Sequence, residues 1–107
     1  MELSQYQIIL VNLDPTMGSE IKKTRPCVII SPDEMNRHLR TIIIAPMTTT
    51  SKVYPTRIKV NHEGVNGYLV IDQIRTIDKI RVIKSLGKLT EKEILEVKRV
   101  MHECFVL

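Results

Sequence analysis

Short β-branched runs separated by turn formers constrain the fold of this chain more than any other feature. Each run is bounded by proline, glycine, asparagine or aspartate, which interrupt strands and favour turns. The predicted strands cover residues 6–13, 27–30, 41–45, 56–60, 67–71 and 80–86. Because no strand–helix–strand repeat supports a parallel sheet, the sequence predicts one small, strongly bent antiparallel sheet or barrel with a few helical additions.

Two of these runs predict central strands. Residues 28–30 and 42–44 are continuously apolar, which indicates strands that are buried on both faces. Residues 56–60 instead alternate between polar and apolar side chains, as in a strand with one face in water.

Two helices are expected beside the sheet. Ser31 and Glu34 have the spacing of a capping box, with Pro32 at the first helical position, and predict a short helix that ends near His38. Thr90 and Glu93 form a second capping box before a longer terminal helix. Its apolar stripe, which must pack against the sheet, comprises Ile94, Val97, Met101, Cys104 and Phe105, flanked by Leu95 and Val100.

Length and charge limit the class of protein. A chain of 107 residues predicts a single domain over residues 1–107. It has neither an apolar run of about 18 residues nor the layout of a signal peptide, so we expect a cytoplasmic protein without membrane attachment. Residues 1–89 carry thirteen basic and eight acidic side chains, whereas residues 90–107 carry three and four. A positive excess on the body of the domain favours a polyanionic partner.

Cysteine and histidine do not indicate a disulfide or metal site. Cys27 and Cys104 each lie in an apolar stretch and are expected to be buried small hydrophobic residues. His38, His62 and His102 lack partners at ligand spacing and are expected on the surface or at caps. The familiar hydrolase and phosphate-loop motifs are also absent from the sequence.

Three ordered blocks carry a resemblance to a known family. They are residues 13–33 (LDPTMGSEIKKTRPCVIISPD), 44–48 (IAPMT) and 72–79 (DQIRTIDK). With these blocks, nearly the whole chain resembles the MazF/PemK/Kid family of toxin–antitoxin endoribonucleases. The resemblance implies an SH3-like antiparallel β-barrel, with a short helix and a C-terminal helix, that forms a homodimer.

The resemblance also implies an activity. Such toxins cut single-stranded RNA, often mRNA, at a short sequence, without metal or other cofactor. The ribose 2′-OH attacks the phosphate and leaves a 2′,3′-cyclic phosphate and a 5′-OH end. A cognate antitoxin with an extended acidic tail would block the RNA groove.

Four residues are candidates for catalysis. Arg25 can hold two phosphate oxygens with its planar guanidinium, and Pro26 favours an extended backbone at that position. Thr48 matches an active-site threonine of the family and would position the phosphate. Glu20 could accept the 2′-OH proton, or could be an ion-paired surface group beside Lys22 and Lys23. Asp72 matches an acid–base position of one branch.

The assignment of Asp72 meets a departure from the family pattern. In that branch an arginine lies two residues before the aspartate, whereas this chain has Val70 there. If Val70 removes the arginine-assisted route, Arg25 with Thr48, and Glu20 as a further candidate, forms the more economical site.

Further residues are candidates for RNA binding. Loops that leave rigid strands carry most binding sites, and lysine contacts to phosphate set affinity and salt dependence. Tyr54 could stack on a base, or could lie over the barrel before Pro55. The predicted binding residues are Ser19, Lys23, Lys52, Tyr54, Gln73 and Arg75.

Two alternative functions are compatible with the same architecture. One is a protein-binding toxin similar to the CcdB poison of DNA gyrase, which depends on a C-terminal tryptophan; this chain has no tryptophan and ends in Phe105-Val106-Leu107. The other is an RNA-binding module without nuclease activity, which would bind RNA without cutting it.

Overall fold

A computed structural model describes residues 2–49, 54–62 and 64–106. The strands are β1 (Gln7–Asn12), β2 (Thr24–Ile29), β3 (Thr41–Thr48), β4 (Arg57–His62), β5 (Val65–Val70), β6 (Arg75–Asp78) and β7 (Val82–Lys88). The helices are α1 (Asp33–His38) and α2 (Glu91–Phe105), with 3₁₀ turns η1 (Ile71–Gln73) and η2 (Lys79–Arg81). Within these ranges, no helix has the length and apolar character needed to cross a membrane.

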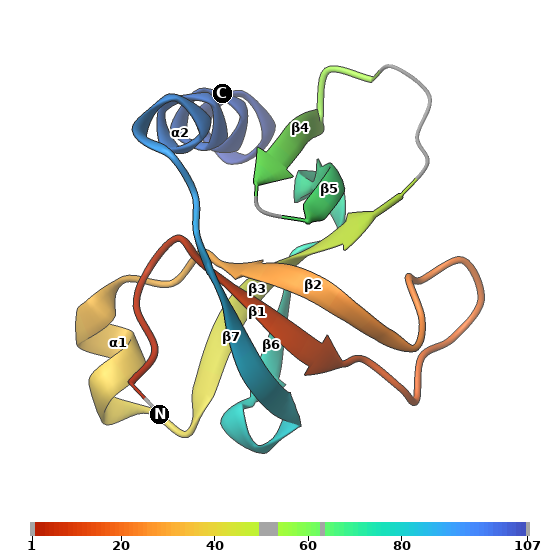
Figure 1. Ribbon diagram of the computed structural model, residues 1–107, viewed down its shortest axis with the longest axis vertical. Helices are drawn as coiled ribbons and strands as arrows, with labels where there is room; N and C mark the ends of the chain where they lie inside the picture. The colour runs from red at the N-terminus through yellow and green to blue at the C-terminus, as the bar shows by residue number, and fades with distance from the viewer. Residues whose placement is uncertain (1, 50–53, 63, 107) are drawn as a thin grey trace.

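The strands form one antiparallel sheet that curls into a half-barrel. The order is β4-β5-β3-β2-β1-β7, and β6 pairs with β3 off this path. Strand β3 pairs with β6 through Thr41–Ile44 and with β5 through Met47 and Thr48, so its two ends belong to different parts of the sheet. Figure 1 shows β4 and β5 beside α2, above the crossing of β1, β2 and β7. The predicted bent antiparallel fold is confirmed.

The central strands separate two apolar clusters because successive side chains of a strand point to opposite faces. One cluster, on the side covered by α2, comprises Ile8, Val28, Ile30, Ala45, Met47, Ile58, Val60, Leu69, Ile71, Leu89, Val97 and Val100. The other comprises Ile9, Val11, Leu13, Cys27, Ile29, Ile42, Ile44 and Ile77. The prediction of two-sided burial is confirmed for residues 28–30 and for Ile42 and Ile44, whereas Ile43 is only half-buried.

Helix α2 begins as predicted and buries the first part of the predicted stripe, with Ile94 and Met101 packed beside Val97 against the core. The Thr90 hydroxyl accepts from the Glu93 amide at 3.2 Å, and the Glu93 carboxylate accepts from the Thr90 amide at 2.8 Å, which confirms this capping box. Val97 and Val100 are each 1% exposed, whereas Leu95 and Phe105 are 66% and 53% exposed. Cys104 is also exposed, so its predicted burial is wrong. Phe105 and Val106 instead line an open hollow with Tyr6, Ile30 and Met101, so the end of the helix is only partly packed.

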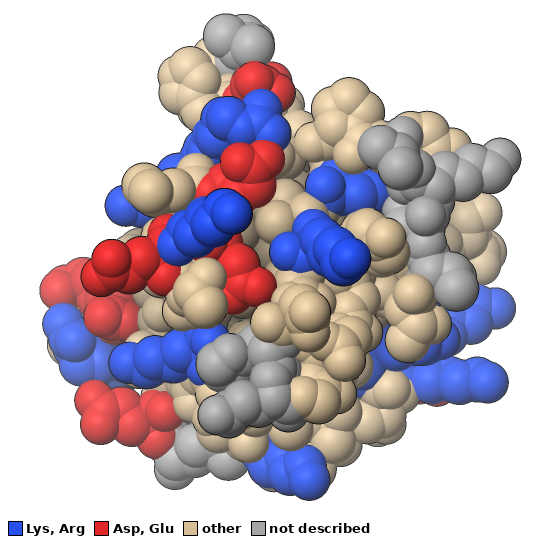
Figure 2. Space-filling model, turned by 45° about the horizontal axis from the view of Figure 1, so that its top comes forward, with Lys and Arg blue, Asp and Glu red and all other residues tan. Residues whose placement is uncertain are grey.

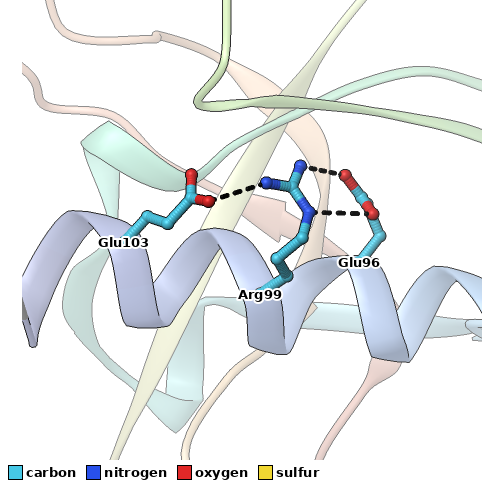
Figure 3. A network of polar contacts seen from close by, with 3 residues as sticks. All are labelled: Glu96, Arg99 and Glu103. Carbon is cyan, nitrogen blue, oxygen red and sulfur yellow. Dashed lines mark hydrogen bonds and ion pairs between the residues drawn. The ribbon is translucent and has the colours of Figure 1, made fainter.

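The outer face of α2 holds an ion-pair network. Arg99 lies between Glu96 and Glu103, with an Nη1–Oε1 distance of 3.0 Å to Glu103 (Figure 3). The hydrogen bond from Arg99 lowers the pKa of Glu96. In Figure 2, acidic side chains gather toward the left, over α2, whereas the right of the view is mostly tan and blue. The acidic residues of the terminal segment therefore lie mainly on one solvent-facing helix.

The capping box predicted at Ser31 and Glu34 does not form, so that prediction is wrong. Pro32 is the N-cap of α1, and no side chain caps the helix. The Ser31 hydroxyl instead donates to Asn36 Oδ1 at 2.5 Å and accepts from the Ile43 amide at 3.1 Å. Ser31 and Asn36 are 2% and 3% exposed. Ser31 therefore ties α1 to β3 through buried hydrogen bonds, because its side chain points into the core instead of along the helix axis.

Several strands differ from the prediction. β2 begins at Thr24 instead of residue 27, and β3 ends at Thr48 instead of residue 45. The sequence pattern does not predict strand β6, because Arg75–Asp78 contains a single apolar side chain, Ile77. Its partner is the first half of β3, with Ile42 opposite Ile77. The predicted strand over residues 80–86 instead begins at Val82, since Ile80 lies in η2 and is 86% exposed.

Candidate functional site

Two predicted catalytic residues meet in one hollow of the surface. Arg25 lies on β2, Thr48 is the last residue of β3, and both line a hollow of about 360 Å³. We call it the basic hollow. Its other lining residues are Leu10, Pro26, Met47, Thr49, Gly64, Val65, Asn66, Lys84 and Leu86.

The position of Arg25 follows from strand pairing and from the loop before it. Arg25 is opposite Val11 in the β1–β2 ladder and is half-buried. Its Nε donates to the Lys22 carbonyl oxygen at 3.2 Å. That hydrogen bond uses one of the five N–H groups of the guanidinium, which leaves others to reach a phosphate.

The position of Thr48 depends on a close approach between β3 and β5. Thr48 is opposite Tyr68, and the neighbouring Gly67 lies against the Thr48 backbone. A Cβ atom at residue 67 would lie 2.6 Å from the Thr48 carbonyl oxygen. Only glycine at residue 67 allows the backbones of β3 and β5 to approach this closely. The close approach in turn sets the position of Thr48 in the lining of the hollow.

Lys84 is a candidate that the sequence reasoning missed. It lies on β7, opposite Leu10 of β1, is exposed, and lines the basic hollow with Arg25 and Thr48. None of the described residues lining the hollow is an aspartate or glutamate. Arg25 and Lys84 therefore bring positive charge to a hollow whose described lining holds no carboxylate, an arrangement that favours an anionic ligand. No sequence signal marked Lys84, since only strand order brings β7 beside β1 and β2.

Five of the other predicted residues, Ser19, Glu20, Asp72, Gln73 and Arg75, line a second hollow. We call it the loop hollow; it also measures about 360 Å³ and includes the end of the loop between β1 and β2. Its lining residues are Leu13, Ser19, Glu20, Ile21, Pro46, Asp72, Gln73, Ile74 and Arg75. The structure thus places Glu20 and Asp72 apart from the lining of the basic hollow, although both hollows take a residue from the end of β3, Pro46 in one and Thr48 in the other.

Hydrogen bonds hold the loop hollow in shape. Gln73 Oε1 accepts from the Ile21 amide at 3.0 Å, and Arg75 Nη1 donates to the Leu13 carbonyl oxygen at 3.4 Å. Glu20 is exposed, and its Oε1 accepts from the Met17 amide at 2.9 Å. Gln73 and Arg75 therefore tie the β1–β2 loop to the segment around η1, whereas the Glu20 carboxylate closes a local turn and also faces solvent.

Asp72 is paired with an arginine that the sequence pattern did not reveal. Arg57 of β4 lies directly opposite Val70 in the β4–β5 ladder and forms an ion pair from Nη1 to Asp72 Oδ1. Its guanidinium carbon also lies 5.5 Å from the centre of the Tyr54 ring, a cation–π contact. Asp72 therefore has an arginine neighbour although residue 70 is valine, because Arg57 reaches it from the adjacent strand across the ladder.

Of the two lysines predicted to bind RNA, the structure describes only Lys23. Lys23 is exposed at the end of the β1–β2 loop, where its amide donates to Asp14 Oδ1 at 2.9 Å. Its φ of 69° is in the left-handed region that side chains with a Cβ rarely adopt. Lys52 lies outside the described residues.

The thiol of Cys27, near the site, is unreactive. Cys27 is buried, donates to the Arg25 carbonyl oxygen at 3.6 Å, and has a pKa raised to about 12 by burial, which the positive charge of Arg75 partly offsets. The thiol therefore stays protonated at neutral pH and is a poor nucleophile. Among the residues that the structure describes, no three or more His, Cys, Asp or Glu side chains group as metal ligands would.

Comparison with known proteins shows the family to which the chain belongs. The family model described as PemK-like, MazF-like toxin of type II toxin-antitoxin system matches residues 4–105. Endoribonuclease MazF of Staphylococcus epidermidis is 33% identical over 97 residues, covering 84% of this chain and 80% of that protein. Endoribonuclease PemK of Escherichia coli is 36% identical over 102 residues, covering 90% and 77%.

Solved structures share the fold. The crystal structure of MazF from Deinococcus radiodurans has a TM-score of 0.90 at 22% identity and covers 100% of this chain and 99% of that chain. A MazE–MazF crystal structure from the same organism has a TM-score of 0.85 at 22% identity, with the same coverage. The family model spans nearly the whole chain, including both hollows, and the protein therefore belongs to the PemK-like, MazF-like toxins of type II toxin–antitoxin systems.

Proposed function

We propose that this toxin is a sequence-specific endoribonuclease that cleaves single-stranded RNA in the basic hollow. The observation that carries the proposal is the meeting of Arg25, Thr48 and Lys84 in one hollow with no carboxylate in its described lining. Relatives named endoribonucleases favour RNA cleavage over the gyrase-binding alternative. As mRNA is the substrate, we place the protein in the cytoplasm.

The reaction needs charge stabilisation more than a strong base. The ribose 2′-oxygen attacks the phosphorus, the bond to the 5′-oxygen breaks, and a 2′,3′-cyclic phosphate forms. Negative charge on the non-bridging oxygens grows in the transition state, and positive groups aimed at that charge lower the barrier. Arg25 takes this role and also stabilises the departing 5′-oxygen, which takes a proton from water to become the 5′-OH. Lys84 adds charge, and the Thr48 hydroxyl positions the phosphate for in-line attack.

The 2′-OH proton has two acceptors in this proposal. One is water in the open hollow, and the other is the exposed Glu20 carboxylate of the loop hollow. A general base that ionises on the acid side would give the rate an acid limb. Loss of that limb in Glu20→Gln would assign the role to Glu20, absence of any such limb in the wild type would assign it to water, and an unchanged limb would exclude Glu20.

The two hollows bind different parts of one RNA strand. The basic hollow holds the scissile phosphate, and Ser19, Gln73 and Arg75 of the loop hollow contact flanking nucleotides. Lys23 at the loop end, with Lys52, adds phosphate contacts that set affinity and salt dependence. Neither hollow is lined by a residue of α2, so its acidic face does not oppose the RNA.

RNA cleavage in chelator tests the proposed function. Arg25 and Lys84 supply positive charge at the phosphate, so we expect the full-length chain to cut a mixed-sequence RNA in excess EDTA. The 5′-OH ends should accept label from polynucleotide kinase without phosphatase treatment, and the 3′ ends should be cyclic phosphates. Intact RNA at micromolar protein, or fragments with 5′-phosphate, would overturn the proposal. Binding without any cutting would support the RNA-binding module instead.

Two protein partners belong to the same proposal. An antitoxin with an acidic extended segment would cover the positive charges of the basic hollow, and a second copy of the chain would cover exposed apolar side chains. These include Ile80, Ile83, Leu95, Phe105 and Val106, which are 86%, 52%, 66%, 53% and 67% exposed. Sedimentation should show twice the 12.3 kDa mass of one chain. A monomer at micromolar concentration would contradict the homodimer.

A further inference from the structure

Tyr54, Arg57 and Asp72 form a connected stack beside the loop hollow. Asp72 lines that hollow and pairs with Arg57, and Arg57 lies against the Tyr54 ring at 5.5 Å. The side chain of Arg57 is 18% exposed and that of Asp72 is 44% exposed, whereas Tyr54 is 48% exposed. The Arg57 side chain is therefore the least exposed of the three, and the side chains on either side of it are more open to solvent.

Backbone geometry fixes this stack. The Arg57 amide donates to the Tyr54 carbonyl oxygen at 3.0 Å, which closes a turn at the start of β4. The Ile71 amide donates to the Thr56 carbonyl oxygen at 3.3 Å, which ties this turn to the segment that carries Asp72. The three side chains thus come from two chain segments joined by hydrogen bonds, and the ring is oriented before any ligand arrives.

We propose that the Tyr54 ring is a platform for an unstacked RNA base, and that Arg57 and Asp72 are positioning residues that hold it. This inference rests on the proposed function. The Arg57 guanidinium contacts the Tyr54 ring, while about half of the Tyr54 surface remains open to solvent. Aromatic rings bind single-stranded nucleic acid by stacking on bases, and a ring held in one orientation loses less conformational freedom on binding.

The stack also changes the role of Asp72. Its Oδ1 is committed to the Arg57 guanidinium. Asp72 therefore acts through Arg57 on the ring and does not take the 2′-OH proton. Its removal should weaken substrate binding without altering the pH dependence of the chemical step.

A non-cleavable probe tests the platform directly. A pool of mixed-sequence 2′-O-methyl RNA oligonucleotides can bind but cannot be cut, because the attacking hydroxyl is blocked. The chain has no tryptophan and three tyrosines, so its intrinsic fluorescence comes from Tyr6, Tyr54 and Tyr68. Stacking of a base on Tyr54 should quench part of this fluorescence.

Matched variants separate stacking from the hydroxyl group. Tyr54→Leu should weaken binding of the probe by about tenfold or more. Tyr54→Phe should keep the affinity but lose the quenching, since phenylalanine stacks without tyrosine emission. Tyr68→Phe, on the strand opposite Thr48, is the control that should keep both the affinity and most of the quenching.

The positioning residues need a kinetic readout. Arg57→Ala and Asp72→Asn should raise KM for cleavage several-fold, leave kcat within about twofold and leave its pH profile unchanged, because these residues support binding and not the chemical step. Arg57→Lys should restore part of the affinity, since a lysine keeps the cation near the ring.

The outcomes distinguish this inference from the proposed function. Quenching and the loss of affinity in Tyr54→Leu support the platform even if the wild-type protein cuts no RNA. Equal KM and equal probe affinity in Tyr54→Leu and the wild type would overturn the platform while cleavage persists. A changed pH profile in Asp72→Asn would overturn the positioning role and return Asp72 to proton transfer.

Discussion

Replacing Arg25 with alanine should lower RNA cleavage about a hundred- to a thousandfold, the usual cost of removing one preorganised group that stabilises transition-state charge. Arg25 is the half-buried cation of the basic hollow and enters it from the paired strand β2. The loss should fall on kcat more than on KM, because charge on the phosphate oxygens grows toward the transition state. Single-turnover cleavage of an end-labelled RNA measures it.

Three further variants show whether the Arg25 effect is specific. Arg25→Lys keeps the charge but not the two-pronged donor, and should recover only a small part of the rate. Arg40→Ala removes an exposed arginine that lines neither hollow and should cleave normally. Lys84→Ala should cost about tenfold, with a weaker salt dependence, because an exposed lysine contributes mainly long-range charge.

The same variants test whether the loss of activity in Arg25→Ala comes from a loss of stability. Arg25 also donates to the Lys22 carbonyl oxygen, so its loss could loosen the loop before β2. If so, thermal stability would fall in both Arg25→Ala and Arg25→Lys in step with activity. Normal cleavage by folded Arg25→Ala would refute the assignment of the basic hollow as the active site.

Gly67→Ala should both destabilise the fold and impair cleavage. The new methyl group would lie 2.6 Å from the Thr48 carbonyl oxygen, so one of the two strands must move. Overpacking of this kind costs about 1–3 kcal/mol in the free energy of unfolding. A shift of about 1 Å in a positioning group can cost about a hundredfold in rate. Urea unfolding and cleavage per folded molecule are the two measurements.

Gly18→Ala is the matched control for this substitution. Gly18 has a φ of 59°, and no atom lies within 4 Å of the place that a methyl group would take, so its cost comes from backbone conformation alone. We expect a loss of about 1 kcal/mol in the free energy of unfolding with little effect on the position of Thr48. Unchanged kcat in Gly67→Ala would mean that the close approach of β3 and β5 does not place the catalytic threonine.

Local sequence signals predicted the elements whose determinants lie close together in the chain. The Thr90–Glu93 capping box operates over three residues, and it was confirmed. The alternation in residues 56–60 was also confirmed, since Ile58 and Val60 are 4% and 0% exposed. The box at Ser31 failed because the serine has a better partner in the core, where Asn36 and the Ile43 amide compete with the helix end.

In the candidate site, too, sequence signals identified some members, and tertiary contacts alone brought in the others. The motif around Arg25 and the IAPMT block around Thr48 marked two of its members, and the structure brings both into one hollow. Lys84 and Arg57 could not be found in this way. Lys84 joins the site because β7 pairs with β1, and Arg57 reaches Asp72 because the β4–β5 register sets it opposite Val70.

The runs of β-branched residues thus determined by themselves that the chain forms a small antiparallel sheet, and the three sequence blocks indicated which family it resembles. The tertiary structure alone decided which predicted residues share a hollow, that Glu20 and Asp72 lie outside the lining of the basic one, and which cations complete the sites. The physical reason is that strand propensity depends on neighbouring residues, whereas strand order and register depend on burying two apolar clusters at once, one on each side of β1, β2 and β3.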